Sequence, residues 1–302
     1  MRWLILCYIF LFSCSNKKPL IYEGWSMTMP YKVIIEDPLD LEQMQKVLDI
    51  TNFSLKEIDL IYNNWNLKSE ISKFNNLEDT LEIEVSKELA DLIKISDYVH
   101  TLSQKRFDPT VGPLSMAFHK AFHENTELVT TASYQIGWEN VSIDNQVLKK
   151  EHQNVALDLC GISKGYLLDL LLTRLKNEGI HNALVEWAGE VRVMGRKKNG
   201  PWKIKIDDRL DPVELNNEAI ASSGSEFHYI VQNEKITHVI NPFKKKPKPL
   251  NAPIYRVTVK AKSCAVADGL ATAAMTFESL EEAQIWASKI TDEHPEISFW
   301  FF

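Results

Sequence analysis

Cysteine, glycine and proline are all scarce in this sequence of 302 residues. Four Cys cannot form the dense disulfide framework of a small secreted scaffold. Eleven Gly and twelve Pro are too few for a fibrous or low-complexity chain, and a hydrophobic content of 45% is too high for a disordered one. The composition is therefore that of a globular protein with a core of its own.

Basic charge is also in short supply. The chain has 34 Lys and Arg against 41 Asp and Glu, a formal net charge of −7, so it has no cationic excess to neutralise nucleic-acid phosphates. A run rich in lysine at residues 244–249 contains no aromatic side chain, and we expect a solvated loop there. No nucleic-acid partner is predicted.

One long apolar run, residues 3–12, lies near the start of the chain and has about half of the roughly 20 residues that a membrane-spanning helix needs. It follows Arg2 and ends in a Ser-Cys-Ser sequence around Cys14, which resembles a bacterial lipobox. We therefore expect a signal peptide over residues 1–13, a lipidated Cys14 with a tether over residues 14–24, and a lipid anchor at the periplasmic side of the cell membrane. The alternative is a plain secretory signal that contains a Cys.

Two thiols remain in the chain after removal of a signal peptide and lipidation of Cys14. Cys160 and Cys264 are far apart in the sequence, which does not fix the distance between them. They either form a disulfide in an oxidising compartment or are two buried free thiols.

Beyond the tether, helical and strand patterns succeed one another without the regular alternation of a Rossmann fold. Apolar residues at helical spacing predict helices, and β-branched runs predict strands. We expect an α+β fold, with a single large domain of mixed sheets flanked by helices over residues 25–302. The expected helices are 40–63, 85–102, 163–178, 268–277 and 280–290, and the expected strands are 31–36, 183–186, 190–194, 202–206, 219–222, 227–232, 238–241 and 255–260.

Two segments combine polar side chains with glycine in ways that favour ligand binding. In residues 157–166 an apolar strand leads through a Gly into a helix with Lys164 in its first turn, and free N–H groups beside a Lys favour a phosphate. In residues 107–114 two Pro and one Gly surround Asp108 and Thr110, which predicts a rigid turn that fixes polar groups. A simple turn between helices is the alternative for the second segment.

A pair of oxygen-bearing residues and a histidine add to these segments. Asp268 and Thr272 are four residues apart, so on a helix they share one face and offer oxygens that Mg²⁺ prefers. The alternative is an Asp that caps the helix and a Thr that bonds to its own backbone. His238 lies near the end of an expected strand, where it could accept a proton or donate to a phosphate, although such a His is often structural.

Taken in order, eight blocks of the sequence resemble the ApbE-type FAD:protein FMN transferases. Residues 107–114 match the motif Phe-Asp-x-Thr-Val-Gly-Pro-Leu of that family almost letter for letter, and residues 268–272, Asp-Gly-Leu-Ala-Thr, resemble its Asp-Ala-x-x-Thr. The blocks are Met27–Tyr31, Trp65–Asn75, Phe107–Leu114, Asp158–Tyr166, Trp187–Glu190, Ser222–Gly224, His238–Pro242 and Asp268–Thr272.

This resemblance implies an Mg²⁺-dependent enzyme that transfers FMN from FAD to a Thr or Ser hydroxyl of a target protein and releases AMP. The implied target is a subunit of a flavin-dependent redox or electron-transport system. We assign the general base to His238 as a hypothesis, because His is the commonest such group. The implied FAD contacts are Met27, Trp65, Arg106, Phe107, Asp108, Asp158, Lys164 and Ile240, and the implied metal ligands are the Gly161 carbonyl, Asp268 and Thr272.

Three departures from the family pattern bear on the loop over the site and on the metal. Phe243-Lys244-Lys245 stands where the family has x-Thr-Gly, Ala271 stands where some members have a second Asp, and Cys160 replaces a Gly. Two other functions therefore stay open. One is a periplasmic FAD-binding protein without transfer activity, and the other is an Mg²⁺-dependent FAD pyrophosphatase that gives FMN and AMP.

Overall fold

The computed structural model describes residues 19–78, 81–129, 134–225, 229–231 and 235–302. The predicted signal peptide, Cys14 and the first part of the predicted tether lie outside these ranges. The first strand begins at Leu20, so residues 20–24, which the sequence assigned to the tether, lie in the main sheet. Among the helices of the described ranges, none is long and apolar enough to cross a membrane.

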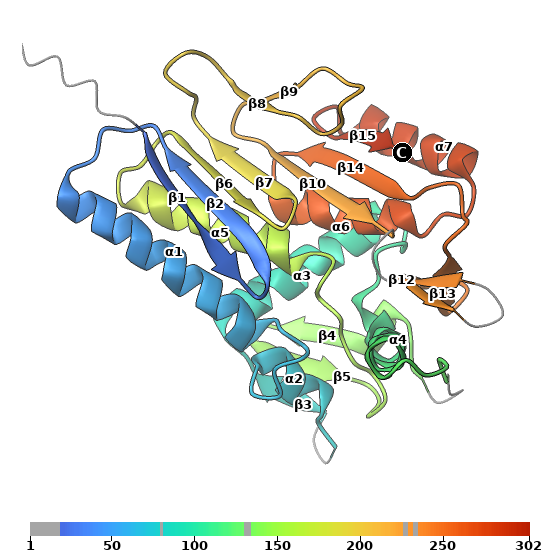
Figure 1. Cartoon of the computed structure of the whole chain (residues 1–302). Helices are drawn as coiled ribbons and strands as arrows, with labels where there is room; N and C mark the ends of the chain where they lie inside the picture. The colour runs from blue at the N-terminus through green and yellow to red at the C-terminus, as the bar shows by residue number, and fades with distance from the viewer. Residues whose placement is uncertain (1–18, 79–80, 130–133, 226–228, 232–234) are drawn as a thin grey trace, which may run out of the picture.

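A seven-stranded sheet forms the centre of the fold (Figure 1). Its strands are β1 (Leu20–Ser26), β2 (Met29–Ile35), β6 (Ala183–Trp187), β7 (Glu190–Met194), β10 (Ala219–Gly224), β14 (Arg256–Ala261) and β15 (Ser298–Phe301). They lie side by side in this order, and every neighbouring pair is antiparallel. A Rossmann fold needs mostly parallel strands, so the predicted α+β class without Rossmann topology is confirmed.

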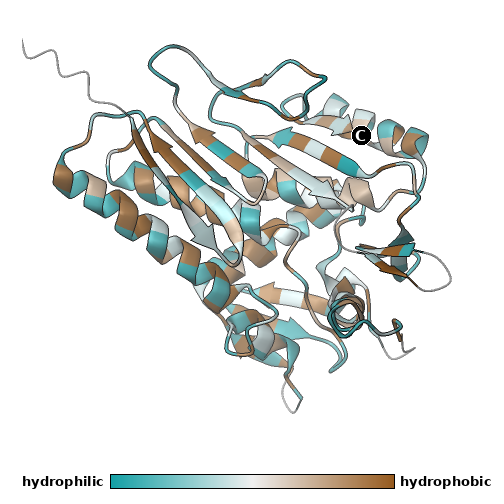
Figure 2. Ribbon diagram, viewed as in Figure 1, coloured by the Kyte–Doolittle hydropathy of each residue, from teal (hydrophilic) through white to brown (hydrophobic). Residues whose placement is uncertain are grey.

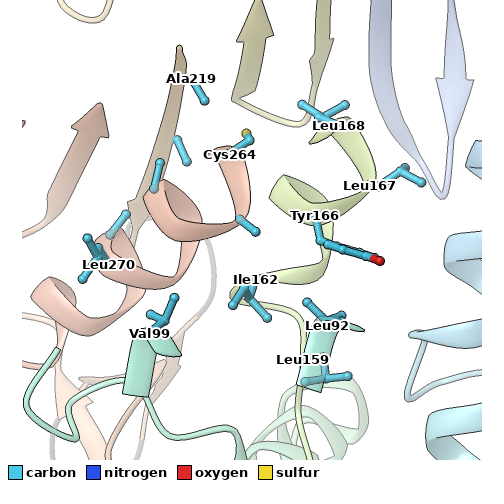
Figure 3. Close-up of a cluster of buried hydrophobic side chains, with 14 of the residues drawn as sticks. Leu92, Val99, Leu159, Ile162, Tyr166, Leu167, Leu168, Ala219, Cys264 and Leu270 are labelled. Carbon is cyan, nitrogen blue, oxygen red and sulfur yellow. The ribbon is translucent and has the colours of Figure 1, made fainter. Parts of the chain in front are cut away.

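Helices cover one face of this sheet. They are α1 (Leu41–Ile61), α5 (Ser163–Asn177), α6 (Cys264–Met275) and α7 (Leu280–Glu293), with α3 (Lys87–Leu102) packed behind α6. Side chains from α3, α5 and α6, among them Leu92, Tyr166 and Leu270, meet in the main core (Figure 3). The outer helix α1 alternates between hydrophobic and hydrophilic residues along its length, as expected of a helix with one face in water (Figure 2).

The other face of the sheet carries a second core under a short hairpin. This hairpin consists of β8 (Trp202–Ile204) and β9 (Val213–Leu215), and its Trp202 is fully buried against Leu184 and Val193. The neighbouring Val185 lies in the main core instead, because successive side chains of a strand point to opposite faces. Both faces of the central strands are therefore covered.

Two three-stranded sheets complete the described fold. One consists of β3 (Glu82–Glu84), β4 (Val141–Asp144) and β5 (Val147–Lys150), and the other of β11 (Tyr229–Val231), β12 (Lys235–Asn241) and β13 (Lys246–Pro249). The remaining elements are α2 (Glu70–Asn75), η1 (Pro109–Val111), α4 (Gly112–Glu124) and η2 (Trp138–Asn140). Since α4 packs against β11 and β12, this smaller sheet lies beside the residues that the sequence singled out at 107–114.

Helix boundaries follow the sequence predictions closely at α1, α3, α5 and α7, but not at α6. This helix begins at Cys264, four residues before the predicted start, because the Ser263 side chain accepts the Val266 N–H as its N-cap. The sequence also did not predict α4, whose first residues, Gly112 and Pro113, were assigned to a turn. Pro at the first turn of a helix needs no N–H partner, so the turn and the helix start are compatible.

Two lysines are fully enclosed by the fold. Lys150 is 0% exposed, and its Nζ donates to the backbone oxygens of Asn75, Gln153 and Val155 at 3.0, 3.0 and 3.2 Å. Lys248 is 1% exposed and donates to the Ile254 oxygen at 2.9 Å. The prediction of a solvated loop at residues 244–249 is therefore wrong, because residues 246–249 form β13 and bury this side chain.

The pH dependence of stability should report the burial of Lys248. Burial lowers the pKa of Lys248 to about 8, from 10.5 for an unperturbed lysine. Between these two values the unfolded chain binds more protons than the folded one, so the free energy of unfolding should rise with pH by about 3 kcal/mol over this window. We expect Lys248→Met to lack this rise in urea denaturation between pH 7 and 10.5. If the free energy of unfolding changed with pH in the same way for the wild type and the variant, Lys248 would not be the group responsible.

Candidate functional site

The start of α5 lies directly against α6. The Thr272 hydroxyl of α6 donates to the Gly161 carbonyl oxygen at 3.3 Å, and the Ser223 hydroxyl of β10 lies 3.3 Å from the Thr272 Oγ1. A Cβ on residue 161 would come within 2.7 Å of that Oγ1, so Gly161 allows the two chain segments to approach. Three oxygen atoms from three separate elements therefore meet at this point.

A buried charged cluster lies beside these oxygens. Asp268 of α6 is 1% exposed, and one of its carboxylate oxygens accepts the Gly165 N–H at 3.1 Å. The other oxygen lies 3.9 Å from the Lys164 Nζ, which also forms an ion pair with the fully buried Glu190 of β7. The cluster thus joins the first turn of α5, the middle of α6 and the start of β7.

The charges of this cluster do not balance. Burial disfavours a charged Lys164, but the carboxylates of Asp268 and Glu190 outweigh burial and raise the pKa of Lys164. Burial raises the pKa of Asp268 and of Glu190. The Glu190 Oε2 is buried and has no hydrogen-bond partner among the described residues. One lysine faces two carboxylates, so a further cation would help to keep both carboxylates ionised.

These residues fit a magnesium ion. A carbonyl oxygen, a hydroxyl and a carboxylate, from Gly161, Thr272 and Asp268, are the oxygen ligands that Mg²⁺ takes, and the excess negative charge favours a cation there. Nowhere in the described ranges, this site included, do three or more His, Cys, Asp or Glu residues form a group that could hold a metal ion, so an ion here would rest on one carboxylate with carbonyl and hydroxyl oxygens. Asp268 does not cap α6, since Ser263 does, so the N-cap alternative for Asp268 is wrong.

Asp158 connects the segment before α5 to two other parts of the chain. Its Oδ1 accepts the Cys160 N–H at 2.9 Å and an Asn64 side-chain N–H at 3.4 Å, and its Oδ2 accepts the Ser115 hydroxyl of α4. The Asp158 N–H donates to the Pro109 oxygen at 2.8 Å. The segments that carry Trp65 and Asp108 are thereby held at the entrance to α5.

The rigid turn predicted at residues 107–114 is present. The Asp108 Oδ1 accepts the Thr110 N–H at 2.9 Å and the Thr110 hydroxyl at 2.5 Å, which caps η1. Burial raises the pKa of Asp108. Phe107 is 3% exposed, and its carbonyl oxygen lies 2.7 Å from the His100 Nδ1. The Asp108 side chain and the Phe107 backbone oxygen therefore fix the turn itself.

Arg106 precedes this turn and reaches the C-terminal end of α6. Its NH1 donates to the Thr276 hydroxyl at 3.3 Å, and its Cζ lies 3.3 Å from the centre of the Phe277 ring. Arg106, which the family resemblance implies as an FAD contact, is thus held at the end of the helix that carries the metal-ligand candidates. Trp65 is 49% exposed, and the centres of its ring and the His119 ring of α4 are 4.8 Å apart.

Three predicted residues lie apart from these contacts. Met27, with φ of 49°, lies in the tight turn between β1 and β2. That turn is beside the β6–β7 turn, because the Ala188 N–H donates to the Pro30 oxygen at 3.3 Å. Ile240 is buried with Leu114 and so serves the core. His238 is half-buried on β12, the strand that packs against α4.

The structure adds polar residues that the sequence did not assign to the site. Glu190 and Ser223 lie within two of the eight sequence blocks that resemble the family, and this position could have identified them. Asn64 and Ser115 gave no signal, because their only distinction is the contact with Asp158. Both Cys160 and Cys264 are free, and Cys160 is exposed, so neither a disulfide nor a pair of buried thiols is present.

A cavity of about 690 Å³ lies elsewhere, between α7 and the edge strand β15. Asp207, Tyr255 and Phe299 are among its lining residues, and none of the predicted site residues is. The candidate site is therefore defined by its polar contacts, and this cavity is not part of it.

Comparison with known proteins places these features in a family. The model of the ApbE family matches residues 26–296. An FAD:protein FMN transferase of Chlamydia muridarum is 36% identical over 295 residues, covering 94% of this chain and 93% of that protein. One from Vibrio cholerae is 30% identical and covers 91% of this chain and 87% of that protein. The crystal structure of the Pseudomonas stutzeri flavinyl transferase ApbE, in its apo form, superposes with a TM-score of 0.79 at 27% identity, over 94% of this chain and 90% of that one.

Proposed function

The chain belongs to the ApbE family and is an FAD:protein FMN transferase, and we propose that it links FMN to a Thr or Ser hydroxyl of a target protein in an Mg²⁺-dependent reaction. The observation that carries the proposal is the charged cluster of Lys164, Asp268 and Glu190 beside the oxygens of Gly161 and Thr272. A diphosphate brings negative charge to the site, and a lysine with a cation at a helix start compensates that charge.

The chemistry is a phosphoryl transfer. The target hydroxyl oxygen forms a bond to the FMN phosphorus, the bond from this phosphorus to the bridging oxygen breaks, and AMP leaves with that oxygen. Bound Mg²⁺ would supply neutralising charge to the diphosphate. Gly161, Asp268 and Thr272 would hold it, Lys164 would contact a phosphate oxygen, and Arg106 would pair with the diphosphate from the other end of α6.

One assay tests the proposal and separates it from the two other functions. Purified protein is mixed with FAD, Mg²⁺ and a candidate acceptor domain, and the products are resolved by denaturing gel fluorescence and chromatography. Covalently fluorescent acceptor with stoichiometric AMP supports the transferase. Free FMN with AMP would indicate a pyrophosphatase, and bound but unchanged FAD would indicate a binding protein.

We assign the role of general base to His238, the residue that would take the proton of the target hydroxyl. Replacement by Ala should then lower the rate of transfer by about 100-fold, which is typical for loss of a general base, while FAD still binds. A His238→Gln variant should be equally slow, since it retains size and polarity but cannot take up the proton. Near-normal transfer by either variant with FAD bound would refute the assignment.

We place the enzyme at the periplasmic side of the cell membrane, held by a lipid on Cys14. The Ser-Cys-Ser sequence after the apolar run supports this placement. A Cys14→Ser protein cannot be lipidated. It should therefore either keep its signal peptide or, if the peptide is removed, appear in the soluble fraction instead of the membrane fraction. Equal amounts of cleaved wild type and variant in the soluble fraction would contradict the lipid anchor.

A further inference from the structure

The turn after β12 is anchored to the end of α6. The Asn241 side-chain oxygen accepts the N–H groups of Phe243 and Lys244, both at 3.0 Å, and its side-chain nitrogen donates to the Thr276 oxygen at 3.1 Å. The Lys244 Nζ binds the Glu278 carboxylate at 2.5 Å. The Phe-Lys-Lys sequence that departs from the family pattern is thus a turn with a fixed backbone.

Phe243 is 57% exposed on this turn. Its ring centre lies 5.3 Å from the guanidinium carbon of Arg106, whose other ring contact is Phe277 at 3.3 Å. The hydrogen bond to Thr276 uses one of the five N–H groups of Arg106. An exposed aromatic ring and a guanidinium with donors to spare therefore lie side by side.

This pairing suits a ligand that carries a planar ring close to a phosphate. A guanidinium binds phosphate oxygens through its N–H groups, and an exposed phenyl ring stacks on a heteroaromatic ring. FAD has a planar ring on each side of its diphosphate. The fixed turn lowers the entropy cost of stacking, because the backbone that carries Phe243 is already ordered.

We propose that Phe243 is a substrate-binding residue that stacks on a planar ring of FAD while Arg106 pairs with the diphosphate. The inference rests on the proposed function, since it takes FAD as the substrate. Phe243 stands at the variable x position of the family's x-Thr-Gly sequence, so the proposal gives a role in substrate affinity to a residue that the pattern leaves open.

The test is the dissociation constant of the full chain for FAD, measured by equilibrium dialysis. Phe243→Ala should weaken FAD binding about tenfold, as expected for loss of one stacking contact, and Phe243→Trp should restore it. Phe53→Ala is the matched control, because Phe53 is 58% exposed on α1 and lies 5.1 Å from the Arg174 guanidinium, away from the site. This control should bind FAD like the wild type.

Three further ligands identify the ring. A loss for FMN and not for ADP assigns the stack to the isoalloxazine, and a loss for ADP and not for FMN assigns it to the adenine. An equal loss for inorganic pyrophosphate would overturn the proposal, because Phe243 would then act only by holding Arg106. Unchanged FAD binding by Phe243→Ala would overturn it as well. A wild type that binds no FAD would instead overturn the proposed function.

Discussion

Replacement of Asp268 by Asn should lower the rate of FMN transfer by about 1,000-fold or more while the protein stays folded. The side chain keeps its size and can still accept the Gly165 N–H, so the contact between α5 and α6 survives. The variant loses the negative charge that faces Lys164 and that a bound Mg²⁺ would need. The measurement is the initial rate of acceptor labelling as a function of Mg²⁺ concentration, with thermal unfolding as the check on folding.

Asp169→Asn is the matched control for this experiment. Asp169 lies on α5 and its carboxylate also holds α6, since it accepts the Ala265 N–H at 3.0 Å and the Ser263 hydroxyl at 2.7 Å. It additionally pairs with Arg192 rather than with Lys164. This variant should be less stable but transfer FMN within a few-fold of the wild-type rate. Equal transfer rates for Asp268→Asn and Asp169→Asn would contradict a role of Asp268 in the reaction.

Replacement of Lys150 by Met should lower the free energy of unfolding by about 3 kcal/mol, because three buried backbone oxygens lose their donor at once. These oxygens belong to Asn75, Gln153 and Val155. Asn75 also holds Leu157, because its side chain accepts the Leu157 N–H and donates to the Leu157 carbonyl oxygen. Loss of Lys150 should therefore loosen the irregular segment at residues 155–159, which leads into the site and is not the strand that the sequence predicted.

Lys248→Met serves as the comparison at neutral pH. This side chain is buried to the same degree, but the contact described for its ammonium is with a single oxygen, that of Ile254. Burial lowers its pKa, so removal of the charge offsets most of the lost hydrogen bond. Urea denaturation at pH 7 should show a large loss of stability for Lys150→Met and a small change of either sign for Lys248→Met. Similar losses of stability for both variants would show that the burial of the lysine, and not the number of carbonyl oxygens it binds, determines the loss.

The sequence predicted the helices and central strands well because their signals are local. Apolar spacing marks α1, α3, α5 and α7, and the predicted strands between residues 183 and 260 correspond to β6, β7, β8, β10, β11, β12 and β14. The start of α6 was misplaced because its first turn, Cys-Ala-Val-Ala, is apolar on all sides and carries no periodic pattern. β13 was missed because a lysine-rich strand is stabilised by its pairing with β12, which no local pattern reveals.

For the site, too, the sequence predicted the features that depend on neighbouring residues and missed those that depend on packing. The spacing of Asp268 and Thr272 predicted a shared helix face, and the Gly-Lys start of α5 predicted a phosphate-binding position. The ion pair of Lys164 with Glu190 could not be predicted, because it joins residues 26 positions apart through the packing of α5 against β7. The contacts of Asp158 with Asn64 and Ser115 depend on the same kind of packing.

The close approach of α5 and α6 has a consequence for how this protein can change over evolutionary time. A Cβ at Gly165 would come within 2.3 Å of the Cys264 carbonyl oxygen, and one at Gly161 would come within 2.7 Å of the Thr272 Oγ1. A larger residue at Gly165 would have to displace the backbone at the start of α6, and one at Gly161 would have to displace the Thr272 side chain. Substitutions at the contact between α5 and α6 must therefore be accompanied by compensating ones. New preferences for an acceptor or a substrate can arise more readily in the turn at Phe243 than between these two helices.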